Sequence, residues 1–432
     1  MICEGLSAFK GRRILLLQGP VGPFFRRLAK DLQQAGAFVH KINFNGGDWA
    51  FYSENASNFR GHAKDWPAYF ENFLAAHEID MVLLFGDCRP LHRAAHEIAT
   101  RKNIEIGVFE EGYVRPDYVT LELRGVNGNS TIPRDPRFYT DATPEDRVTT
   151  HNVGNTFWYA ALWAILYYTA STFSFPFFHR YQHHRPLGIL EGLPWVRSAW
   201  RKMYYKIAEK GIEQTLTGRL SKQYFLAPLQ VHNDSQVQIH SNFESISKFI
   251  ERVIQSFAKH APNHTYLVIK HHPMDRAYRD YNDFIGLLAS TYRIENRVLY
   301  IHDQHLPSLL THARGVVVIN STVGLSALNH ATPLKVCGNA IYDMQGLTFQ
   351  ASLGQFWRTA HIANTDNVLL ERFLNYLITN TQLNGSFYRR LNFPFSHAGL
   401  VWTTKQSAKV SSLSEQTPIA KPEIHLVEMS NN

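Results

Sequence analysis

RILLLQGPVGPFFRRLAKDLQQAGAFVHKINFN, residues 13–45, consists of two apolar runs that flank an amphipathic segment. The runs at 13–19 and 37–45 are typical of buried strands, whereas residues 23–36 repeat apolar side chains at helical spacing. A strand, a helix and a second strand in this order form a β-α-β unit with parallel strands. The stretch therefore predicts an α/β fold in which helices cover a parallel sheet.

The same alternation occurs in two separate series along the chain. Residues 81–87 and 104–112 extend the first series, with a helical pattern between them. The second series predicts strands at 224–230, 266–272, 298–303, 315–321 and 333–339, and a helix at 241–261 with capping-box spacing between Ser241 and Glu244. Because 432 residues exceed what one hydrophobic core usually supports, we predict two facing doubly wound domains.

The sequence pattern divides the chain into four predicted parts. They are an N-terminal Rossmann-like domain at 1–145, a helical segment rich in aromatic and basic residues at 146–222, a second Rossmann-like domain at 223–385, and a C-terminal segment with a polar tail at 386–432. Ligands of such sheets bind beyond the carboxyl ends of the strands. We therefore expect the functional residues at these ends, facing an inter-domain cleft.

The charge balance favours an anionic partner. The net charge is +8, but the basic residues are scattered, so nucleic acid, anionic lipid and a phosphorylated substrate all remain open. The three cysteines, Cys3, Cys88 and Cys337, form no CxxC pair, which argues against a disulfide framework or a zinc site. The N-terminus lacks the pattern of a secretory signal, so we expect a cytoplasmic protein.

Residues 157–178, FWYAALWAILYYTASTFSFPFF, are uncharged and nearly long enough to span a bilayer. Their hydroxyl-bearing side chains and Pro176 weaken a spanning interpretation, while their aromatic rings suit the membrane interface. A spanning helix, an interfacial helix and a helix buried between domains remain open. The basic run HRYQHHR at 179–185 favours contact with an anionic leaflet.

Two adjacent histidines, His271 and His272, end a predicted strand in the motif KHHP. Neighbouring side chains of an extended strand point to opposite faces, so the pair does not easily share a metal ion. Pro273 favours an extended conformation at His272, and Lys270 adds positive charge nearby. We interpret the motif as a phosphate grip centred on His272, with a simple turn as the alternative.

Two further polar groups follow strands of the second predicted domain. Asn320, Ser321 and Thr322 stand at the start of a predicted helix, where hydroxyl and N–H groups bind an anion or cap the helix. Asp234 follows the strand at 224–230. Its carboxylate is either a nucleophile or base, or a turn or helix cap.

Glu110 and Glu111 end the strand pattern at 104–112, directly before a glycine. Only one of two adjacent acids can face a cleft, and either could pair with Arg115. A carboxylate from each domain, such as Glu111 with Asp234, suits glycosyl chemistry. One carboxylate then acts on the acceptor hydroxyl and the other on the anomeric carbon.

Two glycine-containing loops lie in the first predicted domain. Gly19 and Gly22 permit close backbone approach to a phosphate, but their loop lacks the residues of a P-loop or a dinucleotide fingerprint. An acceptor phosphate and a plain tight turn remain open. Asn45 and Asp48 in NFNGGDW suit either a sugar site or a turn.

The motifs LQGPVGPFF, NFNGGDW, FEEGYVRPDYVTLE, HHRP, PLQVHNDSQ, KHHP and NSTVG resemble, as an ordered series, the capsule polysaccharide biosynthesis/export family in its KpsS/LipB-type branch. The resemblance extends to about residue 350. It implies the GT-B arrangement of two Rossmann-like domains and a β-Kdo transferase of Gram-negative bacteria. The implied reaction moves Kdo from CMP-Kdo to a phosphatidylglycerol-type lipid, with retention, and starts the linker of a capsule.

The resemblance also implies a role for each matched residue. Asp234 would attack the anomeric carbon, and Glu111 is favoured over Glu110 as the acceptor base. The CMP phosphate would be bound by Lys270, His272, Pro273, Asn320, Ser321 and Thr322. The candidates for acceptor binding are Gly19, Gly22, Asn45, Asp48 and Arg115.

The implied partners are CMP-Kdo, phosphatidylglycerol or its lyso form, an anionic membrane surface, a second Kdo transferase and the capsule exporter. We expect no nucleic acid, no cofactor and no metal, because an oxocarbenium-like state needs only a carboxylate and cationic stabilisation of the leaving group. The protein would lie peripherally on the inner face of the inner membrane. A CMP-sialic-acid-type transferase and a non-catalytic adaptor in capsule export are the alternatives.

Overall fold

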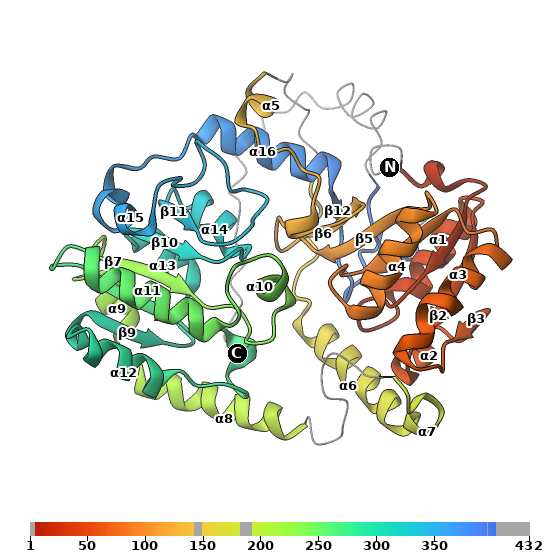
Figure 1. Cartoon of the computed structure of the whole chain (residues 1–432), viewed down its shortest axis with the longest axis horizontal. Coiled ribbons are helices and arrows are strands. Elements are labelled where there is room, and N and C mark those ends of the chain that lie inside the picture. The colour runs from red at the N-terminus through yellow and green to blue at the C-terminus, as the bar shows by residue number, and fades with distance from the viewer. Residues whose placement is uncertain (1–4, 142–148, 182–191, 395, 403–432) are drawn as a thin grey trace. The chain divides into compact units, whose positions relative to one another are not determined.

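The computed structural model describes residues 5–141, 149–181, 192–394 and 396–402, and the chain forms two compact units (Figure 1). Unit 1 takes the ranges 1–131, 143–189 and 374–432, and unit 2 takes 132–142 and 190–373. The predicted polar tail and the second half of the basic run lie outside the described residues.

The seven-stranded sheet of unit 1 has the order β12-β6-β5-β4-β1-β2-β3. Its strands are β1 (Arg13–Leu16), β2 (Phe38–Asn43), β3 (Ala56–Asn58), β4 (Met81–Phe85), β5 (Glu105–Glu111), β6 (Tyr118–Leu123) and β12 (Gln382–Asn384). The helices are α1 (Phe24–Gln34), α2 (Gly46–Phe51), α3 (Trp66–Ala76), α4 (Pro90–Arg101), α6 (Phe157–Phe173) and α7 (Phe175–Phe178). Strands β1 to β5 are parallel, whereas β6 is antiparallel to both its neighbours.

Alternation along β1 fills two cores, one on each face of this sheet. Ile14 and Leu16 pack in the cluster that includes the apolar side of α1. Leu15 packs on the opposite face, in the cluster formed by α3 and α4. Burial on both faces is what makes the strand an uninterrupted apolar run in the sequence.

The five-stranded sheet of unit 2 has the order β11-β10-β7-β8-β9, with all pairs parallel. Its strands are β7 (Tyr224–Pro228), β8 (Tyr266–Lys270), β9 (Val298–Ile301), β10 (Gly315–Val318) and β11 (Leu334–Val336). The helices are α5 (Pro136–Thr140), α8 (Gly192–Ala208), α9 (Ile212–Thr217), α10 (Ser235–Ile239), α11 (Ile246–His260), α12 (Asn282–Thr291), α13 (Leu306–His312), α14 (Val323–Asn329) and α15 (Leu353–Thr359). Helix α16 (Asn367–Asn380) leads from unit 2 into unit 1.

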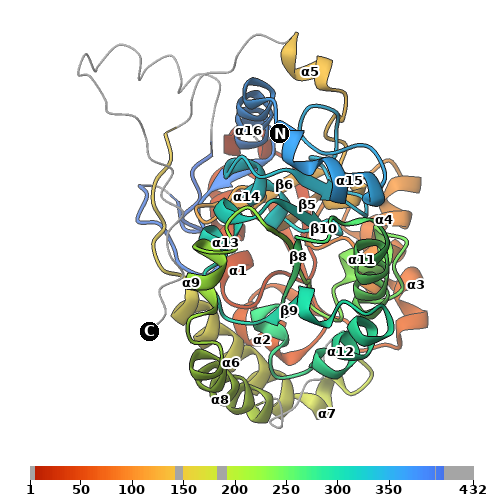
Figure 2. The same ribbon diagram turned by 90° about the vertical axis from the view of Figure 1, so that its left-hand side faces the viewer.

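Helices lie on both sides of the unit 2 sheet. In Figure 2, α11, α12 and α15 lie on one side, and α9 and α13 lie on the other. In chain order the five strands follow the pattern 5-4-1-2-3, the same Rossmann-like order as the five parallel strands of unit 1. The predicted α/β fold with two Rossmann-like domains is therefore confirmed.

The start of α11 differs from the prediction. The helix begins at Ile246 and its N-cap is Ser245, whose side chain accepts from the backbone N–H of Lys248. Ser241 instead accepts from the N–H of Phe243 at 3.1 Å, in the turn before the helix. The prediction of a capping box at Ser241 and Glu244 was wrong because a second serine, Ser245, directly precedes the first apolar residue of the helix, Ile246.

The aromatic segment 157–178 forms two helices rather than one. Helix α6 ends at Phe173, and Pro176 lies in the first turn of the short α7. No helix within the described part of the chain is both long and apolar enough to cross a membrane. Of the three interpretations left open by the sequence, the spanning helix is therefore not observed.

Helix α6 packs on α2 through close backbone approach. A methyl group at Gly46 would lie 1.4 Å from the side-chain oxygen of Ser174, and one at Gly47 would lie 2.6 Å from that of Ser171. The N–H of Gly47 donates to Ser171 at 3.0 Å. The two glycines thus let the aromatic segment lie directly on the end of β2.

Candidate active site

The carboxyl ends of three neighbouring strands carry the predicted donor groups of unit 2. Asp234 follows β7, His272 follows β8, and Asn320 follows β10. Because β7 lies between β10 and β8 in the sheet, these segments emerge side by side. The sheet topology therefore brings together residues that are almost ninety positions apart in sequence.

Asp234 is the N-cap of the short helix α10. Its Oδ1 accepts from the N–H of Gln236 at 2.9 Å, and its Oδ2 accepts from the side-chain amide of Gln230 at 3.0 Å. The same amide of Gln230 donates to Oδ1 of Asn320 at 3.0 Å. The cap that the sequence left open is thus observed, and it fixes the carboxylate in one orientation beside the β10 segment.

Asp275 links the Asp234 loop to the KHHP loop. This aspartate is fully buried in the 3-10 turn η5 (Pro273–Asp275) and accepts from the N–H of His232 at 2.9 Å. Its other oxygen contacts Nδ1 of the same histidine. Two loops from adjacent strands are therefore joined just behind the candidate nucleophile.

His272 is the N-cap of η5. Its Nδ1 accepts from the N–H of Met274 at 3.2 Å. A ring nitrogen that accepts is unprotonated, so the neutral imidazole carries its proton on Nε2. The ring is therefore a hydrogen-bond donor at Nε2 without having to be an imidazolium.

Lys270 ends β8 and is almost completely buried. Burial lowers the pKa of its ammonium group to about 8, while Asp303 and Glu209 act in the opposite direction. The positive charge that the sequence assigns to this position is consequently held in a site of low polarity, where electrostatic interactions are strong.

His271 points into a different environment from His272, as strand alternation predicts. It is only 2% exposed, and its Nδ1 lies 2.6 Å from the hydroxyl of Tyr300. Burial and the neighbouring His302 lower the pKa of His271 to about 4. The doublet therefore holds one buried neutral histidine and one at the loop.

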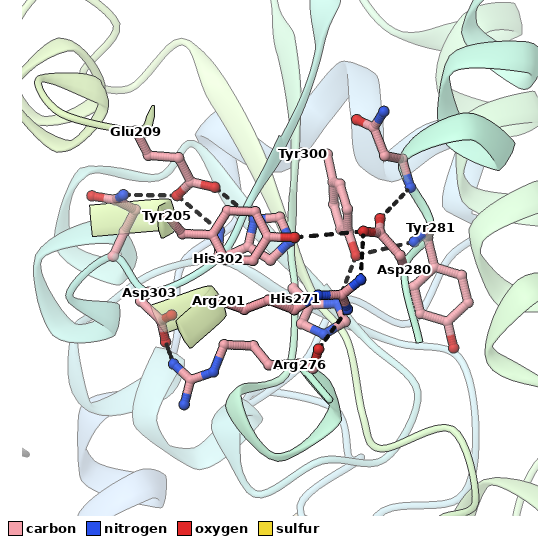
Figure 3. A network of polar contacts seen from close by, with 12 residues as sticks. Arg201, Tyr205, Glu209, His271, Arg276, Asp280, Tyr281, Tyr300, His302 and Asp303 are labelled. Carbon is pink, nitrogen blue, oxygen red and sulfur yellow. Dashed lines mark hydrogen bonds and ion pairs between the residues drawn. The ribbon is translucent and has the colours of Figure 1, made fainter. Parts of the chain in front are cut away.

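A polar network behind His271 joins β9 to helix α8 (Figure 3). Glu209 contacts His302 Nδ1 at 2.6 Å, and the ring of Tyr205 stacks on His302 with centroids 3.4 Å apart. Arg201 of α8 donates to the carbonyl of Arg276 at 2.6 Å, beyond η5. Helix α8 thus supports the KHHP loop, and no sequence motif predicted this arrangement.

The segment after β10 approaches Tyr342 closely. The tyrosine hydroxyl donates to the carbonyl of Ser321, and a methyl group at Gly324 would lie 2.2 Å from this hydroxyl oxygen. The side-chain oxygen of Ser321 accepts from the N–H of Val323 at 3.2 Å, and Thr322 is the N-cap of α14. Both serine and threonine therefore stand at a helix start, as predicted.

In unit 1 the two adjacent acids differ. The side chain of Glu110 accepts from the N–H of Glu111 at 3.0 Å, and burial raises the pKa of Glu110 to about 7. The carboxylate of Glu111 instead accepts from the hydroxyl of Tyr388 at 2.8 Å. A methyl group at Gly86 would lie 3.6 Å from Glu110 and 3.9 Å from Arg89, so these two side chains share the end of β4.

Asn45 and Asp48 are buried and hold α6 in place. The hydroxyl of Tyr167 donates to Asp48 at 2.9 Å, and the amide of Asn45 donates to the same hydroxyl at 2.8 Å. Gln18 contacts Tyr167 as well, at 3.0 Å. Asn45 and Asp48 therefore position the aromatic segment rather than line an open surface.

The other three residues predicted for acceptor binding lie apart. Gly22 has φ near +110° and lies against the ring of Trp163 of α6, and Gly19 lies against Phe25. Arg115 is exposed and donates to the carbonyl of Gly112 at 3.1 Å. The loop glycines therefore serve tight turns and packing in this structure.

Four residues that were not predicted as site residues organise these sites. They are Gln18 and Arg89 in unit 1 and Gln230 and Asp275 in unit 2. Each stands within a few residues of the carboxyl end of a strand, which is the one signal that could have found them.

Comparison with known proteins gives consistent results. Residues 80–388 match the family described as capsule polysaccharide biosynthesis protein. The chain is 41% identical over 390 residues to the capsule polysaccharide export protein KpsS of Escherichia coli, covering 88% of this chain and 97% of that protein. It is 40% identical over 390 residues to the capsule polysaccharide modification protein LipB of Neisseria meningitidis serogroup A, covering 88% and 93%.

Among solved structures, the beta Kdo 2,7 transferase KpsC of Thermosulfurimonas dismutans aligns over 94% of this chain and 100% of that chain, with 13% identity and a TM-score of 0.44. The resemblance seen in the ordered motifs is confirmed by the two relatives at about 40% identity. The chain belongs to the capsule polysaccharide biosynthesis protein family.

Proposed function

We propose that this protein is a retaining glycosyltransferase that moves β-Kdo from CMP-Kdo to a phosphatidylglycerol-type lipid. The observation that carries the proposal is the oriented carboxylate of Asp234, which is held by Gln230 and Gln236 beside the segments that carry His272 and Asn320. Membership of a capsule polysaccharide family and similarity to an export protein and a modification protein of capsules support this substrate class.

In the first step, an oxygen of Asp234 bonds to the anomeric carbon, and the bond to the CMP phosphate breaks with its electron pair. In the second step, the acceptor oxygen bonds to the same carbon, the ester bond to Asp234 breaks, and a carboxylate of unit 1 takes the hydroxyl proton. Two inversions give net retention. The cap geometry aids the first step, because it fixes the carboxylate without a flexible loop.

The leaving phosphate is stabilised from the ends of β8 and β10. His272 donates through Nε2–H, Lys270 supplies charge, and the start of α14 supplies the hydroxyl groups of Ser321 and Thr322. This set needs no metal ion and no cofactor, and Pro273 fixes the turn that follows the histidine.

For the acceptor base the structure favours a change from the sequence-based choice. Glu110 has a pKa of about 7, so it is poised to accept a proton near neutral pH, whereas Glu111 is held by Tyr388. We therefore propose Glu110 as the base and Glu111 as the residue that orients it through the backbone N–H.

Membrane attachment is proposed to be peripheral, through the outward side of α6 and α7. Phe157, Trp158, Phe173, Phe175 and Phe177 of this segment are all more than 60% exposed. Amphipathic aromatic surfaces of this kind bind at the lipid interface. The inner face of the inner membrane, a second Kdo transferase and the capsule exporter complete the proposed setting.

The test is intact-protein mass spectrometry of the purified chain after incubation with CMP-Kdo and no acceptor. We expect a mass increase of one Kdo residue that disappears in Asp234→Asn. Asp283→Asn is the matched control, since this exposed carboxylate also stands in the first turn of a helix of unit 2. It should retain the adduct.

Turnover with lipid acceptor but no adduct under any quench would argue against the covalent step. CMP-sialic acid, used in parallel, separates the two donors, since only the true donor should give both adduct and lipid product. A wild-type chain that releases no CMP from either donor would favour the adaptor in capsule export.

A further inference from the structure

A pocket of about 250 Å³ lies in unit 1, beside the carboxyl ends of β1 and β4, and the mechanism above does not use it. Its polar lining consists of Gln18, Arg89, His92, Arg180 and Tyr181, and its apolar lining includes Phe44 and Phe59. Pockets that hold drug-sized ligands usually measure roughly 300–1,000 Å³, so this one suits a smaller group than a sugar nucleotide.

Two arginines give the pocket a cationic lining. None of the residues that line it, all within the described part of unit 1, is an aspartate or a glutamate. Arg89 is held in place, since it donates to Oε1 of Gln18 at 2.8 Å and lies over the ring of Phe85 at 5.1 Å. A guanidinium fixed in this way is pre-organised to bind a phosphate group.

His92 adds an acceptor to this cationic wall. The residue is 1% exposed, and its Nδ1 donates to the carbonyl of Gly86 at 2.8 Å. Burial lowers the pKa of His92 to about 3, so the ring is neutral and its Nε2 is a bare acceptor. Within the described residues Nε2 has no hydrogen-bond partner, and because His92 lines the pocket, an O–H group of a ligand is a suitable donor to it.

The ligand must therefore combine an anion with a hydroxyl group. Arg89 and Arg180 favour an anion, and Nε2 of His92 favours an O–H group, which a phosphodiester anion does not itself carry. We propose that this pocket binds the glycerophosphate headgroup of the acceptor lipid, with its phosphate on the two arginines and a glycerol hydroxyl on His92. The inference rests on the proposed function and assigns its acceptor to a defined site.

The surroundings of the pocket agree with a lipid source. Arg180 comes two residues after α7 and its exposed aromatic residues, so the pocket lies next to the proposed membrane contact. On its other side Arg89 shares the end of β4 with Glu110, the proposed base. A headgroup in the pocket thus has its lipid side near α7 and a free hydroxyl near the carboxylate.

Binding is tested on the full chain without any donor, by titrating glycerophosphoglycerol, the water-soluble headgroup of phosphatidylglycerol, in a calorimeter. Arg180→Gln should weaken binding about tenfold or more, since it removes a charge-assisted hydrogen bond. Arg60→Gln is the matched control: this exposed arginine lies over Phe178 of α7 at 5.6 Å and does not line the pocket. Equal losses in the two variants would overturn the assignment.

The hydroxyl preference is tested with dimethyl phosphate, a phosphodiester that has no O–H group and should bind about tenfold more weakly than glycerophosphoglycerol. His92→Phe should remove this preference, and its persistence would refute the role of Nε2. Phosphatidylglycerol vesicles should compete with the soluble probe, whereas phosphatidylserine vesicles of equal charge should not. Failure of phosphatidylglycerol to compete would overturn the lipid source.

These measurements are independent of catalysis. If the Kdo adduct forms on Asp234 while glycerophosphoglycerol fails to bind, the pocket assignment is wrong and the proposed function stands. If glycerophosphoglycerol binds as expected while no adduct or transfer occurs with CMP-Kdo, the proposed function is wrong instead.

Discussion

Replacing Glu110 with glutamine should stabilise the protein above neutral pH and at the same time abolish transfer. Burial raises the pKa of Glu110 to about 7 from an ordinary value near 4.5, so above pH 7 the folded state holds a poorly solvated charge. Each pKa unit corresponds to about 1.4 kcal/mol, which sets a ceiling of about 3 kcal/mol on the cost. Because the residue is only half-buried, we expect a gain of about 1–3 kcal/mol in the variant.

The direction of the change in stability depends on the pKa of Glu110 in the folded and unfolded states. The folded value lies above the unfolded one, so the unfavourable contribution grows as pH rises from about 4.5 to about 7 and is constant above that. The advantage of glutamine should therefore be full near pH 8 and absent near pH 4.5. Glutamine keeps an oxygen that can accept from the N–H of Glu111, now at 3.0 Å from Glu110.

The assay is denaturant unfolding of wild type and variant at both pH values, with Kdo transfer measured in parallel. Glu97→Gln, an exposed substitution on α4, is the control and should change neither property. A Glu110→Gln protein that is destabilised near pH 8, or that transfers Kdo at the wild-type rate, would refute the reasoning. Loss of transfer in Glu111→Gln alone would restore Glu111 as the base.

Three further substitutions, with Gly286→Ala as the control for the first, test the packing by denaturant or thermal unfolding. Gly46→Ala should lower the free energy of unfolding by about 1–3 kcal/mol, since its methyl group would lie 1.4 Å from an atom of the segment that follows α6. A methyl group at Gly286 meets nothing within 4 Å, so Gly286→Ala should raise the free energy of unfolding by up to about 1 kcal/mol. Equal effects of the two substitutions would contradict this. Glu209→Gln should cost about 1.5–3 kcal/mol by weakening the contact with His302, and an unchanged midpoint would argue against the network. Ser245→Ala should cost about 1 kcal/mol as a lost N-cap.

The central strands were predictable because helices cover both of their faces, which leaves continuous apolar runs. Strands β6 and β12 were not, because buried polar residues interrupt them. The amide of Gln382 donates to the hydroxyl of Thr120 at 3.0 Å, and neither residue is exposed. That pairing joins positions 262 residues apart, so nothing local in the sequence marks it.

The candidate site was predictable at the level of strand ends and not at the level of single side chains. Asp234 and His272 stand where the pattern places them. The choice between Glu110 and Glu111 depends on Tyr388, which reaches Glu111 from a distant part of unit 1. Likewise Asp48 is of a residue type that often binds sugars, yet its partner is Tyr167 of α6.

The pH dependence of the proposed reaction depends on one titrating residue from each unit. Burial lowers the pKa of His271 to about 4, so this ring is neutral and does not titrate near pH 6.5. Lys270 is charged only below a pH of about 8, because burial lowers its pKa, and Glu110 is ionised only above about 7. Transfer should therefore follow a narrow bell between these two values.

The two limbs of this bell can be separated. Formation of the Kdo adduct without acceptor involves Lys270 and not Glu110. The rate of adduct formation should therefore fall above a pH of about 8 and show no acid limb near 7. Lys270→Met should slow adduct formation and flatten the alkaline limb, since no ammonium group remains to titrate. An acid limb near 7 that persists in adduct formation would assign that ionisation to the donor half, and Glu110 could not then be its source.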